Sequence, residues 1–422
     1  MSSISTQKAR TRVVHDPALP RNIAIFIDGT WNQASTQGPT NVRKLFLASQ
    51  AGVDAGRDQF QFYISGVGTT PKFEDGDGSL SDADYRAQLA RYLLPETPGV
   101  STPDSLKLMG GLTGWGTEGR IKTTYHQLCS TYRHKRDDKD RVFLFGFSRG
   151  AFAARSLAGF VGKVGLLLEE ELEHVERAYE LYERGETAAQ SELADFLEKL
   201  TGVRVVTADS DYYLPVHFLG VWDTVASLGL PSRLEWLTAP FTEYHQVDVP
   251  PSVATARHAL ALHELRGSFE PLPWGTGSHG DIKQVWFTGA HADVGGGYAA
   301  GEDGLSDIPL RWMANEAMDA GLAVDSKAKW WNSATENAVL HHEFKGLFLA
   351  TWPTPRSWLR SATDESMKSH HFHRSTVNYL KEADRVRYRF NLPYVNSGLS
   401  TIDELAFPLA TLSQLLGQEI VG

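Results

Sequence analysis

The sequence predicts an α/β fold with a mostly parallel sheet that is covered by helices on both faces. Two observations lead to this prediction. Short apolar runs end in glycine or a polar residue, as is typical of strands buried on both faces. Segments whose apolar residues recur at helical spacing separate several of these runs, and strands that alternate with helices form parallel sheets.

The expected elements follow one another between residues 22 and 322. We expect buried strands at 22–28, 60–68, 142–147, 215–225 and 283–298. The spacing of apolar residues predicts helices at 117–134, 149–162, 254–266 and 307–322. Two charged amphipathic helices are expected within 168–200, separated near Gly185.

Composition indicates a globular protein that does not bind nucleic acid. Of 422 residues, 41% are hydrophobic and 22% charged, and the net charge of −10 comes from interspersed acids and bases. One cysteine, Cys129, excludes an internal disulfide framework and favours folding in a reducing compartment. The N-terminal residues lack the apolar core of a signal peptide. We therefore expect synthesis in the cytoplasm, and any export should use a route independent of a signal peptide.

Each expected strand has a short polar or glycine-rich motif at its carboxyl end. The motifs are Asp28-Gly29-Thr30, Gly66-Val67-Gly68, Ser148, Asp223-Thr224 and His291-Ala292-Asp293. Ligands of parallel α/β sheets bind beyond the carboxyl ends of the strands. The motifs should therefore meet at one edge and form the functional site.

The segment VFLFGFSRGAFAAR, residues 142–155, contains the pattern G-x-S-x-G between an expected strand and an expected helix. This context is typical of a nucleophile elbow, in which a tight turn exposes a serine and flanking glycines avoid steric conflict. We therefore interpret Ser148 as a nucleophile, with an incidental serine in a structural turn as the alternative.

A serine nucleophile needs a base, and the base needs an orienting acid. In hydrolases with this elbow the chain order is serine, acid, histidine, which Asp223 and His291 satisfy. Asp293 is the rival acid. The rival histidines fall inside expected elements, where a structural role is the simpler interpretation; they are His217, His258 and His263.

The tetrahedral intermediate needs an oxyanion hole. We expect the backbone N–H of Arg149 to supply one donor and the Gly29-Thr30 loop to supply the other. Asp28 should order this loop, with binding of Arg149 or a cation left open.

These blocks resemble a family of α/β-hydrolase domains whose best-understood members are type VI secretion phospholipase effectors. The resemblance covers about residues 22–322 and rests on FIDGTWN, GVGT, LFGFSRGAFAAR, GVWDTVASLG and VWFTGAHADVGGGY. It implies Ser148 as nucleophile, Asp223 as acid and His291 as base, and it suggests a lipid ester as substrate. A secretion apparatus or an immunity protein would be a partner if the chain is an effector.

The prediction is therefore a serine hydrolase of carboxylic esters, acting through an acyl-enzyme without a cofactor. Two alternatives stay open: a metal-dependent hydrolase that uses Asp28, Asp223, His291 and Asp293, and a non-catalytic binding module. No metal site is expected at the histidines elsewhere in the chain.

Three parts are expected along the chain: a flexible arm at 1–20, a hydrolase core at 21–325 with insertions at 72–116 and 167–214, and an aromatic-rich extension at 326–422 that packs on the core or forms a lid. Trp330, Trp331, Phe348, Trp352 and Trp358 fit either a buried aromatic cluster or a peripheral membrane contact. Leu167, Leu168, Leu172 and Val175 could likewise cover the site.

Overall fold

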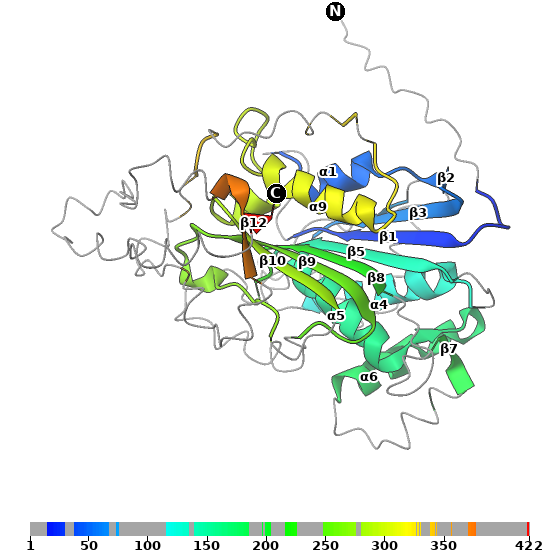
Figure 1. Ribbon diagram of the computed structural model, residues 1–422. Helices are drawn as coiled ribbons and strands as arrows, with labels where there is room; N and C mark the ends of the chain where they lie inside the picture. Colours follow the sequence, from blue (N-terminus) through cyan, green and yellow to red (C-terminus); the bar gives the residue numbers. More distant parts are fainter. Residues whose placement is uncertain are drawn as a thin grey trace, which may run out of the picture.

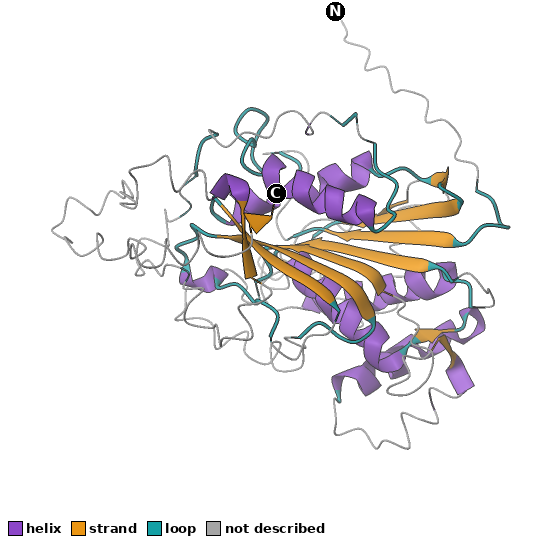
Figure 2. Cartoon of the chain, viewed as in Figure 1, coloured by secondary structure: helices purple, strands orange, loops and turns teal. Residues whose placement is uncertain are grey.

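The core of the chain forms a sheet enclosed by helices (Figures 1 and 2). The computed structural model describes residues 15–29, 38–66, 73–75, 115–134, 139–184, 196, 199–203, 216–225, 248–275, 280–325, 327–328, 330, 338–341, 343, 356, 370–376 and 420–421. The strands that concern the site are β1 (Arg21–Ile27), β3 (Arg57–Ile64), β5 (Arg141–Phe147), β8 (Val216–Trp222), β9 (Val253–Ala261) and β10 (Asp281–Phe287).

The described strands of the main sheet lie in the order β12-β11-β10-β9-β8-β5-β1-β3-β2. All neighbours in this order pair in parallel except the edge strand β2 (Gly52–Asp54), which is antiparallel to β3, as is the short β4 (Phe73–Asp75). β11 (His370–His373) and β12 (Ile420–Val421) continue the parallel sheet beyond β10. The expected mostly parallel α/β fold is confirmed.

Helices cover both faces of the sheet (Figure 1). α1 (Asn41–Ala48) and α9 (Asp307–Asp319) lie on one face, and α4 (Trp115–Thr131), α5 (Arg149–Val164) and α6 (Val175–Glu183) lie on the other. This arrangement explains why β1 carries apolar residues on both of its faces. In β1, Ile23, Ile25 and Ile27 pack into the core that contains α4 and α5, while Ala24 and Phe26 pack into the core that contains α1 and α9.

One expected helix is a strand. The sequence predicts a helix over 254–266, but Val253–Ala261 form β9 between β8 and β10. A strand between two others needs small or apolar residues on both faces, which Ala256, Ala259 and Ala261 supply. The position in the sheet thus overrides the helix preference of alanine.

The charged segment that begins at 168 forms a 3₁₀ helix, η1 (Glu169–His174), followed by α6. Phe160 near the end of α5 contacts the rings of Tyr179 and Tyr182 in α6. Because α5 begins at Arg149, this contact lies roughly 16 Å along the helix from the Ser148 turn. Leu167 and Val175 are fully buried in this distant part of the core, so they do not form a lid.

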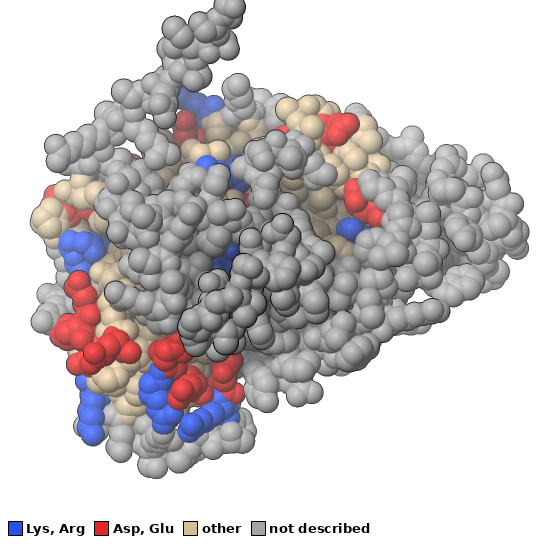
Figure 3. Space-filling model, turned by 180° about the vertical axis from the view of Figure 1, so that it is seen from behind, with Lys and Arg blue, Asp and Glu red and all other residues tan. Residues whose placement is uncertain are grey.

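The division into arm, core and extension stays a prediction, because most of 1–20 and 326–422 lies outside the described residues. Of the aromatic residues in the extension, Trp330 is described and buried in the core with α1 and α9; Trp331, Phe348, Trp352 and Trp358 lie outside. No helix in the described ranges is long and apolar enough to cross a bilayer. On the face seen in Figure 3, described acidic and basic side chains lie beside one another.

Candidate active site

Ser148 occupies a strained turn between β5 and α5. Its φ and ψ are 56° and −121°, a conformation that L residues rarely adopt. The flanking glycines permit the turn: a Cβ on Gly146 would lie 2.4 Å from the carbonyl oxygen of Gly150, and one on Gly150 would lie 2.2 Å from that of Ile27. The pattern G-x-S-x-G is thus a steric requirement here, as expected for a nucleophile elbow.

Asp223 lies at the matching position of the next strand. Phe147 and Trp222 are paired at the ends of β5 and β8, and the Ser148 N–H donates to the Trp222 carbonyl at 3.0 Å. Ser148 and Asp223 each follow this pair by one residue. Asp223 is fully buried and also has a positive φ, of 39°.

His291 contacts Asp223 from the segment that follows β10. It begins the short helix α8 (His291–Gly295) after β10, and its Nδ1 is 2.6 Å from Asp223 Oδ2. Its ring lies against Phe147, the residue before Ser148, with centroids 4.6 Å apart. When neutral His291 donates Nδ1–H to Asp223, its Nε2 is an acceptor and can serve as a base. The structure thus gathers the three predicted residues at one edge of the sheet.

Burial and charge set the protonation of this pair. Burial lowers the pKa of His291 below its ordinary value, although its hydrogen bond to Asp223 acts in the opposite direction. Burial alone would raise the pKa of Asp223, but the charge of Arg356 and the bond to His291 outweigh it and hold this pKa well below the usual range. Asp223 is therefore ionised and His291 neutral near neutral pH.

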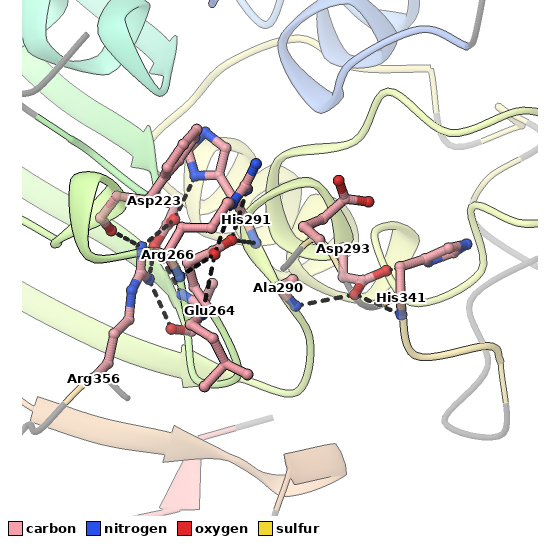
Figure 4. A network of polar contacts seen from close by, with 12 residues as sticks. Asp223, Glu264, Arg266, Ala290, His291, Asp293, His341 and Arg356 are labelled. Atoms are coloured by element: carbon pink, nitrogen blue, oxygen red, sulfur yellow. Dashed lines mark hydrogen bonds and ion pairs between the residues drawn. The ribbon is translucent and has the colours of Figure 1, made fainter. Parts of the chain in front are cut away.

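Arg356 is a site residue that the sequence prediction missed (Figure 4). Its Nη1 donates to Asp223 Oδ1 at 2.5 Å and its Nη2 donates to Oδ2 at 2.9 Å. The two residues are 133 positions apart, and Arg356 belongs to no motif that could have indicated the contact. Only the folded chain brings them together.

The loop after β9 supports His291. Glu264 Oε2 accepts the backbone N–H of His291 at 3.2 Å and also pairs with Arg266 at 2.8 Å. His263 Nδ1 accepts the Gly289 N–H at 2.9 Å. Two other rival histidines also bind the backbone: His258 accepts from the Thr224 N–H, and His217 Nε2 lies 3.0 Å from the Ala320 carbonyl.

Asp293 belongs to a separate network and does not replace Asp223 beside His291. Its Oδ1 is 2.6 Å from His341 Nδ1, and its Oδ2 accepts the backbone N–H groups of Ala290 and His341 (Figure 4). The His341 ring stacks on Tyr298 with centroids 3.7 Å apart. The predicted supporting residue Asp293 thus fixes the loop around His291.

The loop after β1 is ordered by Asp28. Oδ2 of this buried carboxylate accepts the hydroxyls of Thr40 and Tyr63, each at 2.7 Å. Its Oδ1 accepts the Gly29 N–H at 2.7 Å, so this expected oxyanion donor points at Asp28. Thr30, the other expected donor in the loop, lies outside the described residues. Arg149 is the first residue of α5. The first backbone N–H groups of a helix point out of its end and can bind an anion there.

The four residues that a metal centre would use are held in different networks. Asp28 binds Thr40 and Tyr63, Asp293 binds His341, and only Asp223 and His291 contact each other. In the described part of the chain, no three His, Cys, Asp or Glu side chains are grouped as metal ligands. The arrangement can instead orient and activate a nucleophile.

A parallel sheet with a serine on a strained strand-to-helix turn, and with an Asp–His pair at nearby strand ends, places the protein in the α/β-hydrolase class. Residues 21–316 match the family described as the T6SS phospholipase effector Tle1-like, catalytic domain. The match covers more than half of the chain, and the protein belongs to this family.

The chain is also similar to individual proteins. It is 30% identical to the uncharacterized protein YEL023C of Saccharomyces cerevisiae over 253 residues, which are 60% of this chain and 32% of that protein. The chain thus spans about a third of the length of this relative. Among solved structures, an uncharacterized protein from Pseudomonas aeruginosa is 21% identical with a TM-score of 0.38, covering 75% of this chain and 49% of that one. The Tle1 effector bound to the VgrG spike of the type 6 secretion system is 15% identical with a TM-score of 0.40, covering 87% of both chains.

Proposed function

We propose that the protein is a serine hydrolase that cleaves carboxylic esters of phospholipids through Ser148, His291 and Asp223. The observation that carries this proposal is the 2.6 Å contact between His291 and Asp223, beside the strained turn of Ser148. Membership in the phospholipase effector family supports the lipid ester as substrate.

In the first half of the reaction, His291 Nε2 takes the proton from Ser148 Oγ while Oγ attacks the ester carbonyl carbon. The Arg149 N–H would stabilise the oxyanion that forms on the carbonyl oxygen. The tetrahedral intermediate then collapses and breaks the carbon–oxygen bond to the alcohol. His291 returns its proton to the leaving oxygen, which releases the lysolipid and leaves the acyl group on Ser148.

In the second half, His291 takes a proton from water, and the oxygen of that water attacks the acyl carbon. Collapse of the second intermediate releases the fatty acid and returns the proton to Ser148. Asp223 stays ionised throughout and stabilises the imidazolium that forms twice in each cycle. These steps use the chain's own residues and no cofactor.

The partners and the location of the protein belong to the same proposal. Membership in a family of type VI effectors supports export from the cytoplasm by a secretion apparatus and an immunity protein as a second partner. The Tle1 effector named above binds a VgrG spike, and a spike protein of that kind is the proposed partner in export. A lipid substrate also calls for contact with a membrane surface.

Product analysis on phospholipid vesicles tests this function. We expect the wild type to release fatty acid and lysophospholipid, as measured by mass spectrometry, and Ser148→Ala to release neither while it unfolds at a similar temperature. Activity should persist in a chelator and should not depend on added calcium. Products from Ser148→Ala, or activity lost on chelation and restored by calcium, would contradict the proposal.

A further inference from the structure

Arg356 contacts Asp223, the acid of the Asp223–His291 pair. It lies outside the family domain, whose match ends at residue 316. Both terminal nitrogens of its guanidinium contact the carboxylate of Asp223, at 2.5 and 2.9 Å. The same nitrogens donate to the carbonyls of Ala261 at 2.7 Å and Phe269 at 2.5 Å. The Arg356 side chain is 3% exposed, so this contact is shielded from solvent.

The contacts of Arg356 fit a role in orienting the carboxylate of Asp223 better than a role in anchoring the chain around residue 356. A guanidinium that contacts both oxygens fixes the plane of the carboxylate as well as its position. Oδ2, the oxygen that contacts His291, is one of the two that Arg356 holds. Other contacts already fasten this part of the chain to the core: His341 binds Asp293, and Thr376 binds the Thr288 N–H and the Trp286 carbonyl.

We infer that Arg356 is a positioning residue for the catalytic acid, and that the segment after the family domain therefore completes the active site. This role rests on the proposed function, in which Asp223 orients the base. Arg356 would hold the carboxylate of Asp223 ionised and aligned with His291 Nδ1. Its removal would leave a buried carboxylate with one partner fewer.

The charges around His291 predict how the pH dependence of the reaction should change when Arg356 is replaced. Asp223 and Glu264 act on His291 with negative charge and Arg266 acts on it with positive charge, while the positive charge of Arg356 acts on Asp223. Loss of Arg356 removes a positive charge from the Asp223 end, which favours the protonated form of His291. The acid limb of the kcat/KM profile should therefore move to higher pH, a change that a purely structural residue would not cause.

Arg356→Met and Arg356→Lys test this role, with Arg374→Met as the matched control. Arg374 is an exposed arginine of the same extension. Each full-length variant is assayed on a soluble ester across pH, and its unfolding temperature is recorded. We expect Arg356→Met to lower kcat about 10- to 100-fold, the range typical for groups that orient a functional ligand through hydrogen bonds, and to shift the acid limb upward. Arg356→Lys should keep a charge without the two-point contact and give intermediate values.

Wild-type kcat and an unmoved acid limb in Arg356→Met would overturn the inference and leave the proposed function intact. A loss of activity that follows a lowered unfolding temperature, with an unmoved acid limb, would also overturn it, because the residue would then act only on stability. If Arg356→Met does not fold, the Arg356→Lys profile decides between the same two outcomes. Failure of the proposed function would give a different result, because the wild type itself would then not hydrolyse esters at Ser148.

Discussion

Ser148 and Asp223 occupy matching positions in neighbouring strands, each one residue beyond the Phe147–Trp222 pair, and both have positive φ angles, of 56° and 39°. Neighbouring strands lie only about 4.8 Å apart, so this register brings a hydroxyl and a carboxylate to the same end of the sheet. Two strained non-glycine residues side by side indicate selection for function over stability.

Because the backbone at Ser148 is strained, replacing this residue by glycine should give a more stable fold than replacing it by alanine. Glycine adopts a positive φ without steric conflict, so Ser148→Gly should unfold with a free energy roughly 1 kcal/mol higher than Ser148→Ala. Both variants should be inactive, because both lack the hydroxyl. Urea denaturation compares them, and equal stabilities would show that the turn is not strained.

Replacement of Asp223 by asparagine should damage both catalysis and stability. Asp223→Asn removes the charge that orients and stabilises His291, and kcat should fall roughly 10⁴-fold, as it does when a triad acid is replaced in this way. The substitution also removes the carboxylate that pairs with the buried guanidinium of Arg356, at a cost of roughly 3–5 kcal/mol. Kinetics and denaturation on the same preparation measure the two effects. An active, stable Asp223→Asn variant would refute both roles.

The lowered pKa of His291 predicts activity at mildly acidic pH. The base works only when neutral, and burial lowers its pKa below the ordinary value of 6.5. The acid limb of kcat/KM on a soluble ester should therefore lie below pH 6.5, with activity lost as the pH falls through the lowered value. An acid limb at or above pH 6.5 would mean that the imidazole is more solvated or more strongly paired than in this structure.

The glycine at the start of α5 should not tolerate a methyl group. A Cβ on Gly150 would lie 2.2 Å from the Ile27 carbonyl oxygen and 2.6 Å from that of Asp28, both backbone atoms that cannot move away easily. Gly150→Ala should therefore cost about 3 kcal/mol or more and displace Ser148. Gly56→Ala is the matched control: its φ is 77° with open space around the added carbon, so it should cost only about 1–2 kcal/mol. Equal losses in the two variants would contradict the close approach of α5 to β1.

The sequence predicts the parts of the fold and site that depend on local pattern and strand order. The strands that carry Asp28, Ser148 and Asp223 are recognisable because each is apolar on both faces and ends in a polar motif. The pairing of Asp223 with His291 follows from the chain order of hydrolases. The β9 strand could not be found this way, since its alanines favour a helix until its neighbours β8 and β10 are in place.

Contacts between distant segments explain the other differences. Arg356 reaches Asp223 across 133 residues, and nothing near it in the chain marks it as part of a site. The hydrogen bond from the Gly29 N–H to the side chain of Asp28 depends on the rotamer of Asp28, which a sequence does not specify. Such features depend on tertiary packing, so single-sequence patterns cannot reveal them.

The most direct test of the central claim is intact-mass labelling with a fluorophosphonate probe on wild type and Ser148→Ala side by side. An activated serine should take up one adduct in the wild type, and the variant should take up none. Mass spectrometry of peptides would then place the adduct on Ser148. An unlabelled wild type that still cleaves esters, or equal labelling of both proteins, would contradict the assignment of Ser148 as the nucleophile.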